Sequence, residues 1–358
     1  MNNKNPDITR YIWKLGPKCV VWELTLGCNL HCWHCGASAG EARKNELTTE
    51  EALDLCEELA KIRTEAISLM GGEPFLRKDI FQIAQKIKDL DLKLYIITNG
   101  MLIDEKLVKM LVDLKPNSIG LSLDGGTAEV HDEIRGNGTF KKAMEALNML
   151  VAAGLHCTVI TALNKTNVYE LPKIRDLLLK RGIGWQIQMC SGHGERFHEG
   201  FMLSQEEFYW AASFIAETRS KYSLKEMPIT GGDDFGYFSN CLPLVSLATD
   251  YWRGCFAGIR SLGITSDGGI KGCLSLPDEF LEGNIRNRKL SEIWNDPDSF
   301  AYNRRFEKEH LQGFCKTCEH GETCRGGCSD IAYSLTGSLH DNPLCLYRIE
   351  TEKQCLTV

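Results

Sequence analysis

The chain has 358 residues, a formal net charge of −7 and 43% hydrophobic residues, enough for one large domain and a smaller one. Its acidic balance argues against a general nucleic-acid binder, which carries a basic patch. No apolar run reaches the roughly 18 residues of a membrane helix, and residues 1–10 lack the apolar stretch of a signal peptide. We therefore expect a cytoplasmic protein with no nucleic-acid and no membrane partner.

The first 230 residues alternate between short β-branched runs and amphipathic segments. Strands are predicted at 20–26, 66–70, 92–98, 118–123, 157–162 and 184–189, and helices at 49–62, 78–90, 104–114, 140–153 and 169–181. Thr48 and Glu51 form a capping box before the first helix. This alternation indicates a parallel α/β sheet, either open and doubly wound or a partial barrel. In both folds, functional residues gather at the carboxyl ends of the strands.

From about residue 231 the pattern changes, because helical periodicity fades and cysteines crowd the tail. The chain has 16 cysteines, and in a reducing compartment clustered cysteines indicate metal binding or catalysis rather than disulfides. We expect a barrel over residues 1–230, a bridge over 231–254 and a small cysteine-rich, metal-bound domain over 255–358.

Three cysteines directly follow the first predicted strand. Cys28, Cys32 and Cys35 have the spacing C-x3-C-x2-C. Three thiolates on one loop can hold three irons of a cubane 4Fe–4S cluster and leave the fourth iron open. The alternative is structural zinc, which takes four ligands, commonly as two C-x2-C pairs. The spacing favours the cluster.

On this motif the chain resembles the radical S-adenosylmethionine (SAM) superfamily. The resemblance implies a partial (β/α)6 barrel in which the open iron binds SAM. It also implies reductive cleavage of SAM to a 5′-deoxyadenosyl radical that abstracts hydrogen from the substrate. An external electron donor such as flavodoxin or ferredoxin is then required.

The resemblance also assigns SAM-binding roles at the ends of the strands. Gly71, Gly72, Glu73 and Pro74 follow the second strand and resemble the motif that binds the methionine amino group. Glycines allow a close backbone approach, and the carboxylate of Glu73 suits an ammonium group. Further contacts are expected to the ribose, the carboxylate or the adenine, although Met189 is equally well a core residue: Thr98, Asn99, Ser122, Arg135 and Met189.

The tail resembles the SPASM extension of radical SAM enzymes. It contains a C-x2-C-x5-C-x3-C block at 315–328, and the segments 283–285 and 292–294 match the family's GN and EIW elements. The resemblance implies two auxiliary clusters, with two zinc sites as the alternative. The outer cluster would be held by Cys315, Cys318, Cys324 and Cys345, and the inner cluster by Cys255, Cys273 and Cys328.

The predicted inner cluster has three cysteine ligands, one fewer than the four irons of a cubane cluster require. In sulfatase-maturating relatives a further cysteine follows the first by six positions, where this chain has Ser261. Either the inner cluster keeps an open iron or an unmatched cysteine completes it, and Cys241 is the nearest. The remaining cysteines are expected to be buried small hydrophobic residues: Cys19, Cys56, Cys157, Cys190 and Cys355.

The resemblance favours a maturase that crosslinks, oxidises or epimerises a peptide or protein. A radical dehydrogenase or cofactor-biosynthesis enzyme acting on a small molecule is the alternative, and a non-catalytic iron–sulfur or zinc scaffold is a third. Leu274 replaces the catalytic aspartate of formylglycine-forming relatives, which weakens that reaction. Only 18 residues precede Cys19, so a leader peptide would need a separate binding protein or direct contacts with the barrel.

The bridge supplies the catalytic candidates, although its glycines also suit an ordinary turn. Asp233 or Asp234 could accept a proton, and Tyr237 or Cys241 could donate hydrogen or carry an electron. Cys190 and His193, after the sixth strand, could do similar work.

Overall fold

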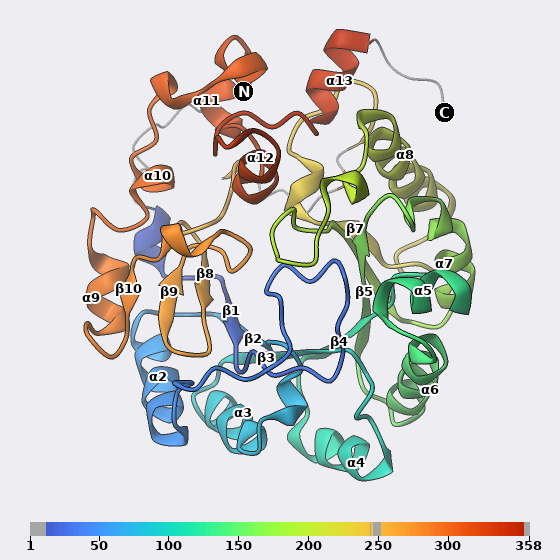
Figure 1. Cartoon of the computed structure of the whole chain (residues 1–358), viewed down its shortest axis with the longest axis vertical. Helices are drawn as coiled ribbons and strands as arrows, with labels where there is room; N and C mark the ends of the chain where they lie inside the picture. The colour runs from blue at the N-terminus through green and yellow to red at the C-terminus, as the bar shows by residue number, and fades with distance from the viewer. Residues whose placement is uncertain (1–11, 244, 246–251, 354–358) are drawn as a thin grey trace.

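Seven parallel strands lie side by side in chain order and curve into a partial barrel (Figure 1). The computed structural model describes residues 12–243, 245 and 252–353. The strands are β1 (Cys19–Glu23), β2 (Ala66–Met70), β3 (Lys93–Thr98), β4 (Ser118–Ser122), β5 (Cys157–Leu163), β6 (Gly184–Met189) and β7 (Ile229–Gly231). A doubly wound sheet reverses its strand order at a switch point, so the uninterrupted order selects the partial barrel and confirms that prediction.

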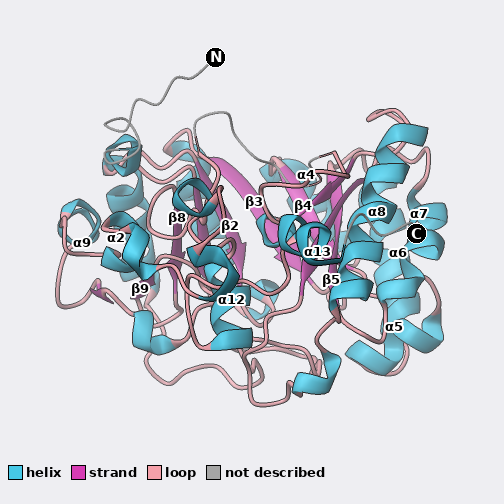
Figure 2. Cartoon of the chain, turned by 90° about the horizontal axis from the view of Figure 1, so that it is seen from above, coloured by secondary structure: helices cyan, strands magenta, loops and turns pink. Residues whose placement is uncertain are grey.

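Helices cover the outer face of the curved sheet (Figure 2). They are α2 (Thr49–Lys61), α3 (Ile80–Asp89), α4 (Glu105–Leu114), α5 (Ala128–Arg135), α6 (Thr139–Ala152), α7 (Leu171–Leu178) and α8 (Gln205–Lys221). The predicted capping box before α2 is present, with the Thr48 side chain on the Glu51 amide and the Glu51 side chain on the Thr48 amide. In the part of the chain that the structure describes, no helix is both long and apolar enough to cross a membrane.

The cysteine-rich region continues the same sheet rather than standing apart from it. Strand β8 (Ser261–Ile264) pairs in parallel with β1, and β9 (Gly269–Lys271) and β10 (Gly283–Asn284) follow as antiparallel neighbours. The sheet therefore crosses the predicted domain boundary. Short helices complete the region: α9 (Leu290–Asn295), α10 (Ala301–Arg304), α11 (Gly321–Cys324), α12 (Ser329–Thr336) and α13 (Leu346–Lys353).

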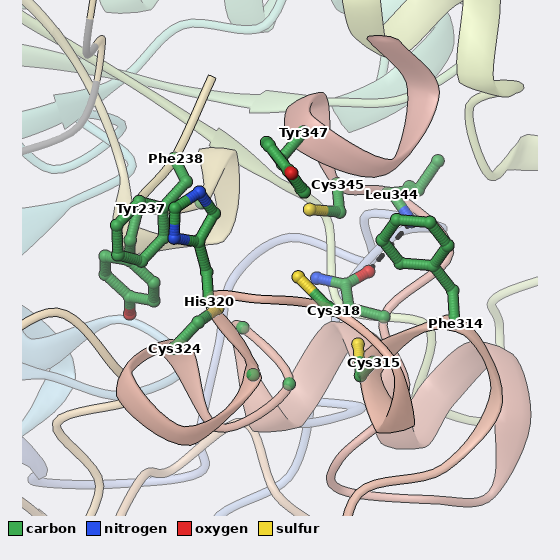
Figure 3. Close-up of a pocket in the computed structure, with 15 residues that line it drawn as sticks. Tyr237, Phe238, Phe314, Cys315, Cys318, His320, Cys324, Leu344, Cys345 and Tyr347 are labelled. Carbon is green, nitrogen blue, oxygen red and sulfur yellow. Dashed lines mark hydrogen bonds between the residues drawn. The ribbon is translucent and has the colours of Figure 1, made fainter. Parts of the chain in front are cut away.

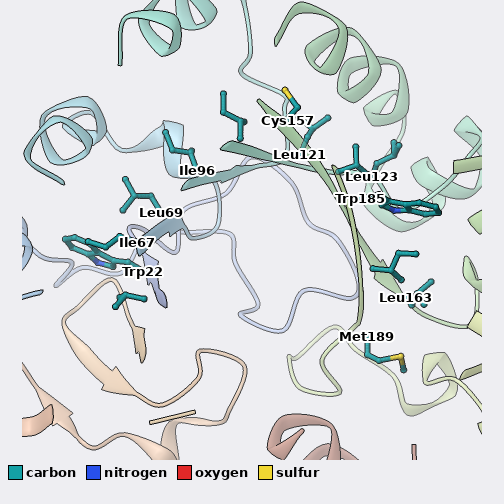
Figure 4. Packing of buried hydrophobic residues seen from close by; sticks show 14 of the residues in the cluster. Trp22, Ile67, Leu69, Ile96, Leu121, Leu123, Cys157, Leu163, Trp185 and Met189 are labelled. Atoms are coloured by element: carbon teal, nitrogen blue, oxygen red, sulfur yellow. The ribbon is translucent and has the colours of Figure 1, made fainter. Parts of the chain in front are cut away.

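One continuous apolar core fills the space between the sheet and the helices. Figure 4 shows the strands curving around the loop that follows β1, with Trp22, Leu121 and Trp185 along them. All three side chains are at most 1% exposed. A curved sheet that is packed on its outer face presents its strand ends to one shared space, and the candidate site lies there.

Among the described residues, seven helices and four strands were not predicted: α5, α8, the five short helices α9 to α13, and β7 to β10. Helix α8 was not predicted because it buries residues on several faces, including Phe208, Tyr209 and Phe214, and so shows no single apolar stripe. Helix α5 is mostly polar, and β7 to β10 are two to four residues long. Such short elements carry too few residues for a periodic signal.

Candidate active site

The loop between β1 and α2, which carries Cys28, Cys32 and Cys35, lies inside the curve of the barrel (Figure 1). The amide of Leu30 donates to the Cys28 sulfur, and the amide of Ala39 donates to the Cys35 sulfur, each at 3.4 Å. Backbone N–H groups aimed at sulfur stabilise thiolates, which are the ligands that iron requires. The three residues therefore fit a cluster in donor type, and two of the three sulfurs accept backbone N–H groups.

The backbone of Gly71 and Gly72 packs directly against the start of this loop. A methyl group on Gly71 would lie 2.3 Å from the carbonyl oxygen of Thr25, and one on Gly72 would lie 2.3 Å from that of Gly27. The amides of Gly72 and Glu73 donate to the same two carbonyl groups at 2.8 Å. Glycine is thus required here because two backbones touch, in addition to any contact with a ligand.

Glu73 is fully buried at the end of β2. Its carboxylate accepts hydrogen bonds from the Thr98 hydroxyl at 2.8 Å and the Asn99 amide at 2.9 Å. Burial raises the pKa of Glu73 to about 7, although the hydrogen bonds from Asn99 and Thr98 oppose the shift. A cationic ligand would favour the ionised form, so this carboxylate suits an ammonium group.

Thr98 and Asn99, the predicted ribose contacts, position protein groups in this structure. Besides the contact of Thr98 with Glu73, the Asn99 side chain donates to Asn29 at 2.8 Å and to the Cys28 sulfur at 3.9 Å. The two residues therefore fix the cysteine loop and the carboxylate relative to each other. Their contact with ribose stays a prediction, as do the roles of Pro74, which begins a short 3-10 turn, and of half-buried Ser122 at the end of β4.

A buried charge network lies beside the loop. Arg135 donates through Nε to Asp124 at 2.5 Å, and His34 Nε2 lies 3.2 Å from the same carboxylate oxygen. Burial raises the pKa of Asp124, but the positive charges of Arg135 and His34 outweigh it and hold that pKa well below its usual range. The sequence offered no signal for this pairing of His34 with Asp124. The carboxylate of Asp124 holds Arg135 close to Cys32. Because this contact uses Nε, the other two guanidinium nitrogens of Arg135 remain for a ligand carboxylate.

The predicted backbone contact of Met189 with adenine stays a prediction. Its N–H donates to the carboxylate of Asp234 at 2.5 Å, so only its carbonyl group remains for a ligand. Burial raises the pKa of Asp234 to about 7 and that of Asp233 to about 6. Asp234 therefore joins the turn at Asp233–Phe235 to the end of β6, and its proposed role as a proton acceptor stays a prediction.

Four cysteines of the tail line one pocket. Figure 3 shows the sulfurs of Cys315, Cys318 and Cys345 turned towards the same space, and Cys324 also lines it. Burial and then the neighbouring charges of Cys345 and Cys315 raise the pKa of Cys324 well above its ordinary value. Thiolates brought together in this way need a metal to neutralise them, so the predicted outer set fits a cluster.

Cys255, Cys273 and Cys328, the predicted inner set, are close enough for their charges to interact. Each is buried enough that its thiol pKa is raised, and the charge of Cys255 adds to the shift of both others. Among the described residues, no three His, Cys, Asp or Glu side chains converge closely enough for a single metal ion.

The structure places Tyr237 between the two tail sets. Its side chain is 2% exposed, and after burial the charges of Cys255, Cys328 and Cys324 contribute to a pKa well above the ordinary value. Cys241 takes part in a disulfide, so in this state it offers no thiol to the inner set, to hydrogen donation or to electron transfer. Of the remaining cysteines, Cys56, Cys157 and Cys190 are buried as predicted, Cys19 is half-buried, and Cys355 lies outside the described residues.

A polar cluster, which sequence reasoning did not assemble, joins the barrel to the tail. Asp330, two residues after Cys328, accepts from the Ser191 hydroxyl at 3.2 Å and lies 3.4 Å from His193 Nε2. His193 Nε2 is also 2.8 Å from the Ser334 hydroxyl. The cluster of Ser191, His193, Asp330 and Ser334 therefore spans the space between the β1 loop and the inner cysteines.

A family model for the radical SAM superfamily matches residues 22–178, and one for an iron–sulfur cluster-binding domain, SPASM, matches residues 255–319. An AdoMet-dependent heme synthase of Methanosarcina barkeri is 31% identical over 93% of this chain and 97% of its own length. The chain is a radical SAM enzyme with a C-terminal SPASM domain. These two domains imply SAM binding and iron–sulfur clusters.

Other radical SAM proteins resemble this one at lower identity. Mycofactocin maturase MftC of Mycobacterium ulcerans is 29% identical over 91% of this chain and 86% of its own length. The crystal structure of SuiB from Streptococcus suis bound to SAM superposes with a TM-score of 0.74 at 18% identity, covering 91% of this chain and 76% of SuiB. The last likeness establishes a shared fold.

Proposed function

We propose that this radical SAM enzyme oxidises a peptide or protein substrate bound between the barrel rim and the SPASM domain. One observation carries the proposal: the cluster of Ser191, His193, Asp330 and Ser334 bridges the SAM side to the inner cysteines. Cys190, next to this cluster, is close enough to both Asp124 and Asp330 for their charges to add to the burial that raises its pKa. A substrate held there would lie between a radical source and an electron acceptor.

The contacts of each residue indicate its role in the proposed reaction. When bound, the cluster and SAM supply the electron transfer and hydrogen abstraction on which the family's chemistry rests. Cys28, Cys32 and Cys35 would hold the cluster, Glu73 would bind the methionine ammonium group and Arg135 the carboxylate. The imidazole of His193, oriented by Asp330 and Ser334, accepts the proton that leaves the substrate. The tail cysteines would hold auxiliary clusters, which would supply the acceptor for the second electron.

The peptide assignment draws on two relatives. A maturase is among the similar proteins, and SuiB, which shares the fold, has been solved bound to the precursor peptide SuiA. An iron tetrapyrrole is the second candidate, because the heme synthase of M. barkeri matches over 97% of its length and an Fe-coproporphyrin III synthase of the same organism is 30% identical.

The test is anaerobic incubation of the reconstituted enzyme with SAM, dithionite and each substrate in turn. The probes are the short peptides encoded beside its gene and Fe-coproporphyrin III, with mass spectrometry of substrate and 5′-deoxyadenosine as the readout. We expect a peptide product lighter by two hydrogens and no change in the tetrapyrrole. The triple variant Cys28→Ala, Cys32→Ala, Cys35→Ala should form neither product nor 5′-deoxyadenosine. A changed tetrapyrrole beside unchanged peptides would select the second candidate.

A further inference from the structure

The inner auxiliary site has three cysteines and a vacancy in its ligand set that no cysteine of the described chain fills. Ser261 occupies the position of the fourth cysteine, at the start of β8, where it pairs with Cys19 of β1. Cys241, the nearest unmatched cysteine in the sequence, is disulfide-bonded. A cubane cluster has four irons to ligate, so either one iron is open or another kind of side chain completes the site.

The hydroxyl oxygen of Tyr302 lies next to Gly272, the residue before Cys273. This hydroxyl is buried and has no hydrogen-bond partner within the described residues. A methyl group on Gly272 would lie 2.2 Å from it. The absence of a side chain at Gly272 therefore makes the room into which the phenol points.

The position of this phenol is fixed by its neighbours in the chain. Asn303 donates to the carbonyl oxygens of Cys255 and Ala257 at 2.7 and 2.8 Å, and Arg304 donates to that of Gly258 at 2.8 Å. These bonds fasten α10 to the turn that runs from Cys255 to Ser261. The turn itself is closed by the amide of Gly258 on the carbonyl of Ser261 at 2.9 Å.

The surroundings of the hydroxyl are those of a ligand to the inner site. Burial first, and then the charges of Cys255 and Cys273, raise the pKa of this phenol. Tyr237 is another buried phenol without a hydrogen-bond partner among the described residues, and its pKa is raised by burial and then by the charges of Asp233, Cys255, Cys328 and Cys324. A buried polar group without a partner costs about 1–3 kcal/mol, and coordination removes that cost.

We propose that the phenol oxygen of Tyr302 is the fourth protein ligand of the inner auxiliary cluster, beside its three cysteines. Coordination releases the phenol proton to solvent, as it releases the thiol protons of the cysteines. No iron of that cluster is then open to substrate, so the inner cluster accepts electrons without binding the substrate. This inference rests on the proposed auxiliary clusters.

The test uses the full chain with Cys28, Cys32 and Cys35 replaced by alanine, which removes the SAM-binding cluster with its open iron. Iron analysis should give about eight irons per chain, from two cubane clusters. Cyanide, a ligand for an open iron, is then added to the reduced protein and the electron paramagnetic resonance spectrum is recorded. We expect no change in this background.

Adding Tyr302→Phe should create a cyanide-sensitive signal, and Tyr302→Cys should abolish the sensitivity again because a thiolate refills the position. Tyr237→Phe is the matched control, a buried phenol near the same cysteines, and should stay insensitive. A cyanide shift in the parent background, or none in Tyr302→Phe, overturns the assignment of Tyr302. An iron content near zero in the parent background would instead refute the auxiliary clusters, and the assignment with them.

Discussion

The imidazole Nε2 of His193 lies 2.8 Å from the hydroxyl of Ser334, although the first residue belongs to the barrel rim and the second to helix α12 of the SPASM domain. This contact and the carboxylate of Asp330, 3.4 Å from the same nitrogen, fix the orientation of the imidazole ring. The two halves of the enzyme thus share one polar cluster.

Replacing His193 by Gln should separate SAM cleavage from product formation. The cluster cysteines and Glu73 are untouched, so 5′-deoxyadenosine should still form, whereas product should fall by about 100-fold or more because the proton acceptor is lost. The ratio of product to 5′-deoxyadenosine, measured by mass spectrometry, checks this. His198→Gln, an exposed histidine of the same loop, is the control. An unchanged ratio would rule out this role for His193.

Glu73→Gln should weaken SAM binding. The amide oxygen can still accept from Thr98 or Asn99, but the negative charge opposite the ammonium group is gone. A charge-assisted hydrogen bond contributes about 1.5–3 kcal/mol, so the dissociation constant should rise by about 10- to 100-fold. Equilibrium binding to the reconstituted protein measures it, with Glu105→Gln on the surface of α4 as the control. Equal affinities for wild type and Glu73→Gln would refute the assignment.

Gly72→Ala should displace the cysteine loop. The added methyl group would meet the carbonyl oxygen of Gly27 at 2.3 Å, and neither backbone can yield without moving Cys28. We expect about four irons per chain to be lost while the tail clusters remain. Gly200→Ala is the matched control, because a methyl group there meets nothing within 4 Å. Full iron content in Gly72→Ala would contradict this account of the motif.

Asp234 should make the folded protein less stable as the pH rises. Burial raises its pKa from 3.8 to about 7. Between pH about 4 and 7 the unfolded chain is ionised while the folded carboxyl still holds its proton, so the free energy of unfolding falls by up to about 4 kcal/mol over this range.

Asp234→Asn removes that dependence while keeping an acceptor for the Met189 amide. Thermal unfolding at pH 5.5 and 7.5 should therefore show a smaller difference in Tm for the variant than for the wild type. Asp176→Asn, an exposed residue of α7, should leave the wild-type difference intact. A pH dependence as large in Asp234→Asn as in the wild type would show that another group is responsible.

The sequence by itself determined six strands of the barrel and its first helices, and it singled out the cysteines that are predicted to be ligands. Alternation of period 2 and 3.6 is a local property, so the bounds of β2 and β6 match the prediction to the residue. The spacing of Cys28, Cys32 and Cys35 is local too. Such features depend on residues a few positions apart, which is the range over which a sequence pattern can be read directly.

Only the tertiary structure decided what depends on residues far apart in the chain. A run of strands and helices suits both a barrel and a doubly wound sheet, and the pairing of neighbours chose the barrel. Asp124 meets His34 across 90 positions, and His193 meets Ser334 across 141. The hydroxyl of Tyr302 likewise comes to Gly272 only because Asn303 and Arg304 fasten α10 to the turn after Cys255. These contacts follow from how the sheet curves and where its edge continues into the SPASM domain, and no local pattern encodes that packing.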